Sequence, residues 1–123
     1  MNLKKFSKVN LERCTSPEGF GHSLNSWSPA EWTNAIAGEL GEAANLTKKL
    51  LRHRDKTAGN YKAEDQDVFS LHARAAHELA DAIIYADLAI QRLGFDTSDI
   101  LCQVFNSKSE QLNCSIRYEE DQN

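Results

Sequence analysis

Two long segments of this chain carry apolar residues at helical spacing, and this pattern constrains the fold more than any other feature. A spacing of three and four residues places side chains on one face of an α-helix. Each segment is therefore predicted to be a long amphipathic helix, and the pair favours an all-α fold. The apolar stripe of residues 28–54 is Trp32, Ile36, Leu40, Ala43, Leu46 and Leu50, and that of residues 68–93 is Leu71, Ala75, Leu79, Ala82, Ala86, Ala89 and Leu93.

Local signals mark the ends of these two segments. Ser28 can cap the first free amides, Pro29 suits the first helical position, and Glu31 lies where the helix dipole favours an acid. Gly94 follows the second stripe and is a common helix terminator. Residues 55–67 are polar and show no apolar period. We expect them to form a connecting loop that is long enough for an antiparallel return.

Two pairs of acids flank the stripes with the same spacing. Glu39 and Glu42 accompany the first stripe, and Glu78 and Asp81 accompany the second. At about 100° per residue, the first acid of each pair lies roughly 40–60° from its stripe centre and the second roughly 100–120°, in the same rotational sense. If the stripes face each other in an antiparallel pair, all four carboxylates emerge on the same side. The sequence therefore predicts an antiparallel hairpin with a four-carboxylate cluster along one edge.

The chemistry of such a cluster points to a hard metal ion. Carboxylates gathered beside an apolar seam repel one another and lose hydration, which is costly unless a cation neutralises them. Oxygen ligands suit Mg²⁺, with Mn²⁺ as a substitute, and Mg²⁺ completes its shell with water and substrate phosphates. Metal-assisted attack of water on a phosphate chain is the predicted chemistry, and one spare carboxylate could act as general base. The alternative is two solvated acid pairs on amphipathic helices.

These motifs resemble a known family. The stretch GELGEAANLTKKL followed by HELADAIIYADLAIQRLG resembles the MazG-like, all-α nucleotide pyrophosphohydrolases, whose signature is an E-x-x-E helix and then an E-x-x-D helix. Glu39, Glu42, Glu78 and Asp81 match the four signature positions, and the resemblance extends from about Trp27 to about Asn113. It implies Mg²⁺-dependent hydrolysis of a nucleoside triphosphate to the monophosphate and pyrophosphate. It also implies a dimer or tetramer of helical hairpins.

Three residues are candidate phosphate contacts. Lys49 lies seven residues after Glu42, at nearly the same angular position, although a cation near a helix end also complements the dipole. A third helix is predicted within residues 95–115, and its N-x-K pair, Asn106 and Lys108, resembles a downstream family element that helps to hold substrate phosphates. The family often continues with basic residues. This chain continues instead with Ser, Glu and Gln, which leaves the role of Lys108 open.

The N-terminal part offers candidate base contacts. A short helix is predicted from Asn2 to about Cys14, with Leu3, Phe6 and Val9 on one face, and a loop rich in Pro and Gly follows it. His22, Asn25 and Trp27 in this loop could stack on a base and read its edge. The other interpretation is that the aromatic side chains of this loop plug the end of the helical bundle.

Composition excludes several classes of protein. The chain of 123 residues has a formal net charge of -4 and no basic patch, which argues against binding of duplex nucleic acid. No apolar run is long enough to span a membrane, and no signal segment precedes the first helix. Three cysteines without C-x-x-C spacing indicate reduced thiols in a cytoplasmic protein.

We expect a single all-α domain that forms a four-helix-type bundle. Its parts are an N-terminal helix and aromatic loop in residues 1–27, two motif helices with a polar connector in 28–94, a third helix in 95–115 and a frayed tail in 116–123. The apolar stripes exceed what one hairpin can bury, so we expect a homodimer or homotetramer to complete the bundle. A di-iron carboxylate protein is disfavoured because its Glu-x-x-His motifs are missing. Two alternatives stay open: a non-catalytic helical interaction module, and a pyrophosphohydrolase acting on a non-standard or phosphoribosyl-linked substrate.

Overall fold

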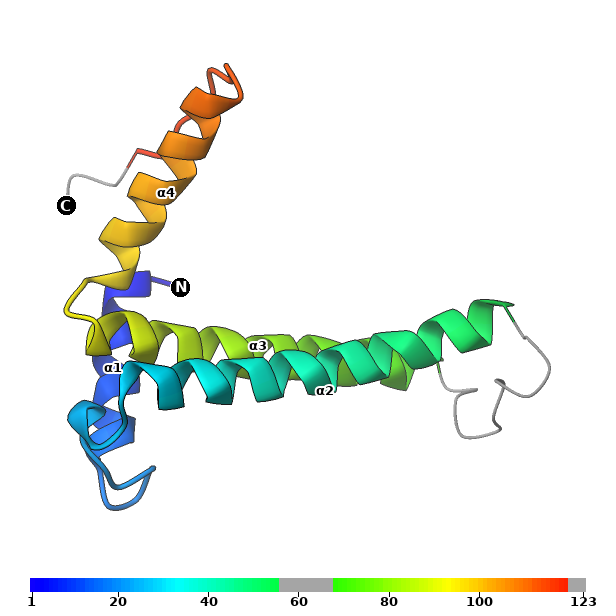
Figure 1. Cartoon of the computed structure of the whole chain (residues 1–123), viewed down its shortest axis with the longest axis horizontal. Coiled ribbons are helices and arrows are strands. Elements are labelled where there is room, and N and C mark those ends of the chain that lie inside the picture. The colour runs from blue at the N-terminus through cyan, green and yellow to red at the C-terminus, as the bar shows by residue number, and fades with distance from the viewer. Residues whose placement is uncertain (56–67, 120–123) are drawn as a thin grey trace. The chain divides into compact units, whose positions relative to one another are not determined.

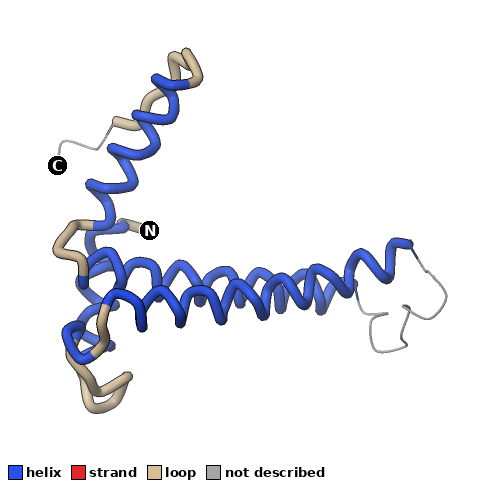
Figure 2. Tube along the Cα trace, viewed as in Figure 1, coloured by secondary structure: helices blue, strands red, loops and turns tan. Residues whose placement is uncertain are grey.

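The computed structural model of this chain describes residues 1–55 and 68–119 (Figure 1). In these ranges every regular element is helical, so the predicted all-α class is confirmed (Figure 2). Most of the predicted connector, from residue 56 onward, and the last four residues of the tail lie outside the described residues. The elements are α1 (Leu3–Thr15), the 3-10 helix η1 (Leu24–Ser26), α2 (Pro29–Asp55), α3 (Val68–Arg92) and α4 (Thr97–Gln111).

The chain divides into two compact units. One comprises residues Met1–Trp27 and Asp87–Asn123, and therefore contains α1, η1, the end of α3 and α4. The other comprises Ser28–Ala86, with α2 and most of α3. Helix α3 belongs to both units.

In the unit Ser28–Ala86, α2 and α3 pack closely as an antiparallel hairpin, as predicted (Figure 1). The rings of Trp32, near the start of α2, and Tyr85, near the end of α3, lie 6.4 Å apart between centroids. Farther along α2, Leu46 packs in a buried cluster with Leu71 and Ala75 from the first turns of α3. The start of each helix thus contacts the end of the other, which requires opposite directions.

The start of α2 is fixed by a reciprocal capping box. The Glu31 amide donates to Ser28 Oγ at 3.2 Å, and the Ser28 amide donates to Glu31 Oε2 at 2.9 Å. Each side chain accepts a hydrogen bond from a backbone amide that has no partner within the first helical turn. Gly94, with a φ of 93°, follows the end of α3, where left-handed backbone favours glycine. Both helix boundaries agree with the sequence signals.

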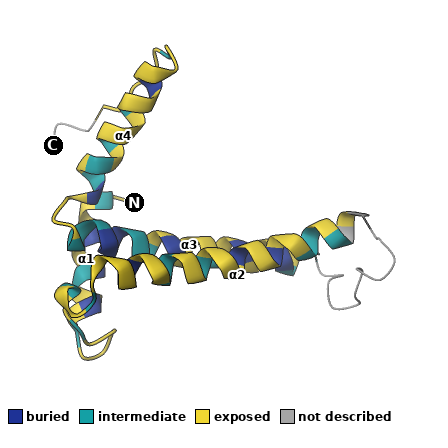
Figure 3. Cartoon of the chain, viewed as in Figure 1, coloured by how far each residue is buried: buried dark blue, intermediate teal, exposed yellow. Residues whose placement is uncertain are grey.

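The hairpin buries only part of each predicted stripe (Figure 3). Trp32, Leu46 and Leu71 are buried, whereas Leu40 is 47% exposed and Leu79 46% exposed. A helix with one neighbour can bury only the line of side chains that faces it. Leu40 and Leu79 lie at the edges of their stripes in this hairpin and remain half in contact with solvent.

In the other unit, helix α1 forms as predicted, but its most buried side chains are not the expected ones. Ser7, Asn10 and Cys14 are buried, whereas Val9 is 50% exposed. Val9, which the sequence places on one face with Leu3 and Phe6, therefore lies largely in solvent. The buried face of α1 is partly polar because it binds a buried carboxylate.

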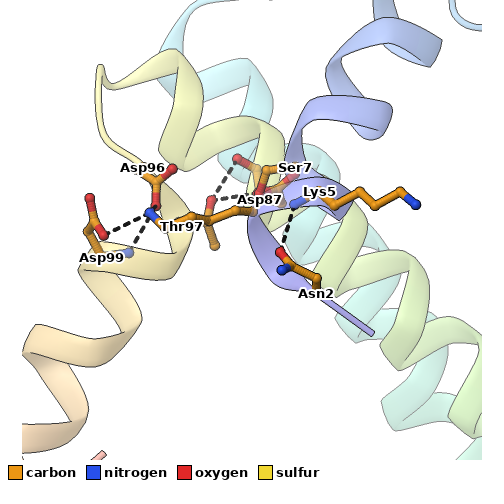
Figure 4. A network of polar contacts seen from close by, with 8 residues as sticks. Asn2, Lys5, Ser7, Asp87, Asp96, Thr97 and Asp99 are labelled. Atoms are coloured by element: carbon orange, nitrogen blue, oxygen red, sulfur yellow. Dashed lines mark hydrogen bonds and ion pairs between the residues drawn. The ribbon is translucent and has the colours of Figure 1, made fainter. Parts of the chain in front are cut away.

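That carboxylate belongs to Asp87, whose contacts are drawn in Figure 4. Asp87 is 2% exposed. Ser7 Oγ and Thr97 Oγ1 each donate to Asp87 Oδ1 at 2.5 Å. Asn10 Nδ2 and Gln91 Nε2 donate to Asp87 Oδ2 at 2.9 and 3.0 Å. A buried carboxylate needs such donors to offset its lost hydration. Through this one side chain, the end of α3 is bonded to α1 and to the first residue of α4.

The start of α4 is capped by Asp96, which accepts a hydrogen bond from the Asp99 amide at 3.0 Å (Figure 4). Lys4 of α1 lies 3.2 Å from Asp96 Oδ1 and 3.0 Å from Asp99 Oδ1. Hydrogen bonds from the Asp99 amide and from Lys4 lower the pKa of Asp96 below its ordinary value. The ion pairs are exposed and contribute little by themselves, so the cap is the larger local stabilisation.

Candidate metal centre

Three of the four predicted acids offer carboxylate oxygens close to one another. Glu39 comes from α2, and Glu78 and Asp81 come from successive turns of α3. One oxygen from each of the three lies within 4.8 Å of the other two. Glu39 and Glu78 are half-buried and Asp81 is exposed. The spacing of three residues on α3 directs Glu78 and Asp81 to one side, and the antiparallel hairpin brings Glu39 of α2 to the same side.

The fourth acid, Glu42, belongs to the same cluster. Its pKa is raised above the ordinary carboxyl value, first by a hydrogen bond with Glu78 and then by the negative charge of Glu78. Desolvation and the charge of Asp81 act in the same direction. A neighbouring carboxylate disfavours ionisation of Glu42, and a shared proton or a bound cation would relieve the repulsion. The hairpin thus brings all four predicted acids together.

The carboxylates of Glu39, Glu78 and Asp81 form a group that could hold a metal ion. Oxygen ligands in an octahedral Mg²⁺ shell lie at about 2.1 Å from the ion, so ligands on opposite sides are about 4.2 Å apart. The Glu39, Glu78 and Asp81 oxygens lie within 4.8 Å of one another, so a single ion could be held by all three. The donors are all carboxylate oxygens, which suits Mg²⁺ or Mn²⁺ better than softer metals.

The candidate phosphate contacts lie in different places. Lys49 is half-buried on α2, two turns beyond Glu42 and about 10 Å farther along the helix axis. Asn106 and Lys108 lie on the continuous helix α4, where two residues differ by about 200° in direction. The two side chains of the N-x-K pair therefore point to opposite faces of α4. Asn106 is half-buried and Lys108 is exposed.

The Asn106 side chain is engaged with the chain's own C-terminal segment. The Tyr118 amide donates to Asn106 Oδ1 at 2.7 Å, and Asn106 Nδ2 donates to the Tyr118 carbonyl at 3.0 Å. Both polar groups of the Asn106 amide are thus used by the backbone of a single residue. No local sequence pattern indicates this pairing, because it depends on how the segment after α4 folds back.

The candidate base contacts form part of an aromatic stack. The His22 ring is stacked with the ring of Phe20, at 6.2 Å, and with the ring of Trp27, at 5.0 Å between centroids. Arg13 lies over Phe20, 5.9 Å from the ring centroid. These ring distances are already those of stacked pairs, so a base could not enter between His22 and Trp27 without separating them. Asn25 is exposed on η1, outside this stack.

The loop that carries this stack is folded tightly against α1. A side chain at Gly19 would meet the Arg13 carbonyl oxygen at 1.9 Å, so only glycine fits there. The Cys14 thiol donates to the His22 carbonyl at 3.4 Å, and the His22 amide donates to the Cys14 carbonyl at 3.1 Å. Burial raises the pKa of the Cys14 thiol. The stack is thus held by the backbone of its own loop.

Comparison with family models, with curated proteins and with solved structures finds no match to this chain. Within the described ranges, no helix combines the length and the apolar character needed to cross a membrane. All three cysteines are free thiols.

Proposed function

We propose that this chain is a metal-dependent pyrophosphohydrolase that converts a nucleoside or deoxynucleoside triphosphate to the monophosphate and pyrophosphate. One observation carries the proposal: Glu39, Glu42, Glu78 and Asp81 gather at one edge of the α2–α3 hairpin. Carboxylates this close together destabilise the folded state when no cation is bound. A bound divalent cation would offset their repulsion and stabilise the folded state. The resemblance of the two acid motifs to the MazG-like family supplies the substrate class.

In this proposal Glu39, Glu78 and Asp81 hold Mg²⁺, or Mn²⁺ in its place, with Glu42 at the edge of the site. The bound ion would polarise phosphoryl oxygens and offset the charge of the phosphate chain. Glu42 is the candidate general base, because a carboxylate with a raised pKa takes a proton from water more readily than an ordinary one. Lys49, on the same face of α2, would contact the far end of the phosphate chain.

A homo-oligomer is part of the proposal. Leu40, Leu79 and Ile83 of the hairpin are 47%, 46% and 63% exposed, which leaves an apolar edge on α2 and α3. A second hairpin packed on this edge would complete a four-helix bundle, as a homodimer or, with a further interface, a homotetramer. The exposed apolar residues support this assembly, because isolated hairpins seldom leave so many large apolar side chains in water.

The decisive experiment measures pyrophosphate release from a panel of ribo- and deoxyribonucleoside triphosphates, with Mg²⁺ and with EDTA. Glu42→Gln removes one charge and keeps the shape of the side chain. Glu12→Gln makes the same chemical change on the exposed surface of α1 and is the matched control. Release that needs Mg²⁺, is lost in Glu42→Gln and persists in Glu12→Gln would support the proposal. Absence of release from every nucleotide would refute it.

The second candidate function is a helical interaction module, and the surface of α4 favours it. Leu101, Val104 and Phe105 lie one turn or less apart and are 52%, 60% and 51% exposed. Such a face could bind a partner protein without any catalysis. Thermal stability separates the two functions, because a metal site raises the melting temperature by mass action when Mg²⁺ is added. An interaction module would melt at the same temperature with Mg²⁺ and with EDTA.

A further inference from the structure

Two cations flank the acid cluster at the same spacing along the two helices of the hairpin. Lys49 lies seven residues after Glu42 on α2, and Arg74 lies seven residues before Asp81 on α3. At about 100° per residue, seven residues return to nearly the same direction, about 20° away. Each cation therefore points to the same side of its helix as the acid from which it is counted. Arg74 lies outside the acid motifs of the sequence.

The antiparallel hairpin places both cations beyond the same end of the cluster. Glu42 of α2 is hydrogen-bonded with Glu78 of α3, which sets the register of the two helices. Arg74 comes one turn before Glu78 and thus lies level with α2 about one turn beyond Glu42. Lys49 lies about two turns beyond Glu42, in the same direction along α2. The acids and both cations all belong to the unit Ser28–Ala86.

Neither cation has an ion-pair partner among the described residues. Arg74 is exposed and Lys49 is half-buried. Arg74 and Glu78 have the spacing of an ion pair within a helix, yet they do not form one. The edge of the hairpin therefore has a negative part, at the four acids, and a positive part beyond it. An anion held by a metal at the acids would extend toward the positive part.

We propose that Lys49 and Arg74 form the subsite for the two phosphate groups that leave as pyrophosphate. This inference rests on the proposed function, in which the acid cluster holds the phosphate chain of a triphosphate through a metal. The first phosphate group lies at the acids, and the second and third lie toward the cations. In the reaction, a water oxygen bonds to the first phosphorus and the water gives a proton to Glu42. The oxygen that bridges the first and second phosphorus atoms leaves with the electron pair, as part of pyrophosphate.

The two cations suit this leaving group. Negative charge grows on the pyrophosphate as the bond to the first phosphorus breaks, so cations placed there stabilise the transition state more than the bound substrate. Arginine has a planar fork that binds two phosphate oxygens at once, whereas lysine is a single point charge. Arg74 lies nearer to the acids and contacts the second phosphate group. Lys49 lies one turn farther and contacts the third.

Binding of inorganic pyrophosphate tests the subsite without any hydrolysis. We expect calorimetric titration in Mg²⁺ to show binding to the unmodified chain and about tenfold weaker binding to Arg74→Gln and to Lys49→Gln, because each variant loses a charge-assisted hydrogen bond. Arg74→Lys keeps the charge and should recover part of the affinity. The matched control is Lys48→Gln, which removes the same charge at an exposed position about 100° away on α2 and should bind like the unmodified chain. Equal affinities for all the proteins, or no binding of pyrophosphate to the unmodified chain, would overturn the proposal.

Kinetics and thermal melting separate the subsite from the proposed function. We expect Arg74→Gln and Lys49→Gln to lower kcat/KM for the triphosphate about tenfold, and Lys48→Gln to leave it unchanged. Mg²⁺ should still raise the melting temperature of all three variants, because none of these side chains is a metal ligand in the proposal. Equal kcat/KM in all the proteins would overturn the subsite and leave the hydrolase intact. No hydrolysis by the unmodified chain would refute the hydrolase, and the pyrophosphate titration would then decide on the subsite by itself.

Discussion

The carboxyl groups of Glu42 and Glu78 share a hydrogen bond across the α2–α3 hairpin. Two carboxylates at this distance repel each other, so one of them holds a proton more tightly than an isolated carboxyl group does, and the pKa of Glu42 is raised accordingly. A divalent cation can replace that proton and neutralise more charge. The pair is therefore a source of instability in the metal-free protein, which a bound cation would relieve.

The first prediction concerns the charge at Glu42. We expect Glu42→Gln to raise the melting temperature of the metal-free protein at neutral pH, because an amide can donate to Glu78 without a bound proton. The same change should weaken the stabilisation by Mg²⁺, since the cluster loses one charge. Thermal melting in EDTA and in a series of Mg²⁺ concentrations measures both effects. Glu12→Gln on α1 should leave both unchanged, and a lower melting temperature for Glu42→Gln in EDTA would contradict the prediction.

The second prediction concerns pH. Because the pKa of Glu42 is raised in the folded protein, its stabilising contribution is fully present below the ordinary value of 4.5 and is lost as the pH rises through the folded pKa. In EDTA, the stability of the unmodified chain relative to Glu42→Gln should therefore fall as the pH rises above 4.5. With Mg²⁺ the trend should reverse, because the ion competes with the proton and binds the ionised cluster. Urea unfolding at several pH values measures both slopes, and a stability difference that is constant over pH would exclude coupling at Glu42.

The third prediction concerns the buried carboxylate of Asp87. Asp87→Ala removes the acceptor of four hydrogen bonds and leaves the donors of Ser7 and Asn10 buried without it. Loss of a buried charged network of this kind costs about 3 kcal/mol or more. Ser7→Ala removes one donor only and should cost about 1 kcal/mol. Urea unfolding followed by circular dichroism provides the comparison, and equal stabilities for Asp87→Ala and Ser7→Ala would show that Asp87 is not the centre of the network.

The hairpin and its acid cluster were predictable because both follow from helical periodicity. The angular positions of Glu39, Glu42, Glu78 and Asp81 relative to their stripes are fixed by 3.6 residues per turn, and only one direction of pairing puts them on the same side. The capping box of Ser28 and Glu31 and the helix stop at Gly94 are likewise local signals. These features could be predicted from the sequence alone because each of them depends on local helix geometry.

Other features depend on tertiary contacts that no local pattern encodes. Ser7 and Asn10 are polar residues of the kind usually found on a solvent-exposed helix face. They are buried here, where they donate hydrogen bonds to the carboxylate of Asp87. The sequence also placed Asn106 and Lys108 together as a phosphate-binding pair, whereas a continuous helix directs them apart and the Tyr118 backbone occupies Asn106. A polar side chain can face solvent, join a buried hydrogen-bond network or bind a ligand. The spacing of residues along the sequence does not distinguish these three roles.

The last prediction concerns assembly. If the exposed edge of the hairpin packs against a second copy, a charge on that edge should prevent the association. Ile83 of α3 is 63% exposed, so Ile83→Asp costs the isolated chain little but places a carboxylate in the proposed interface. Val9→Asp makes a similar change on α1, outside the hairpin, where the residue is 50% exposed. We expect light scattering to give an oligomer for the unmodified chain and for Val9→Asp, and a smaller species for Ile83→Asp. A monodisperse monomer for the unmodified chain would contradict assembly, and an unchanged oligomer in Ile83→Asp would place the interface on another surface, of which the exposed face of α4 is the next to test.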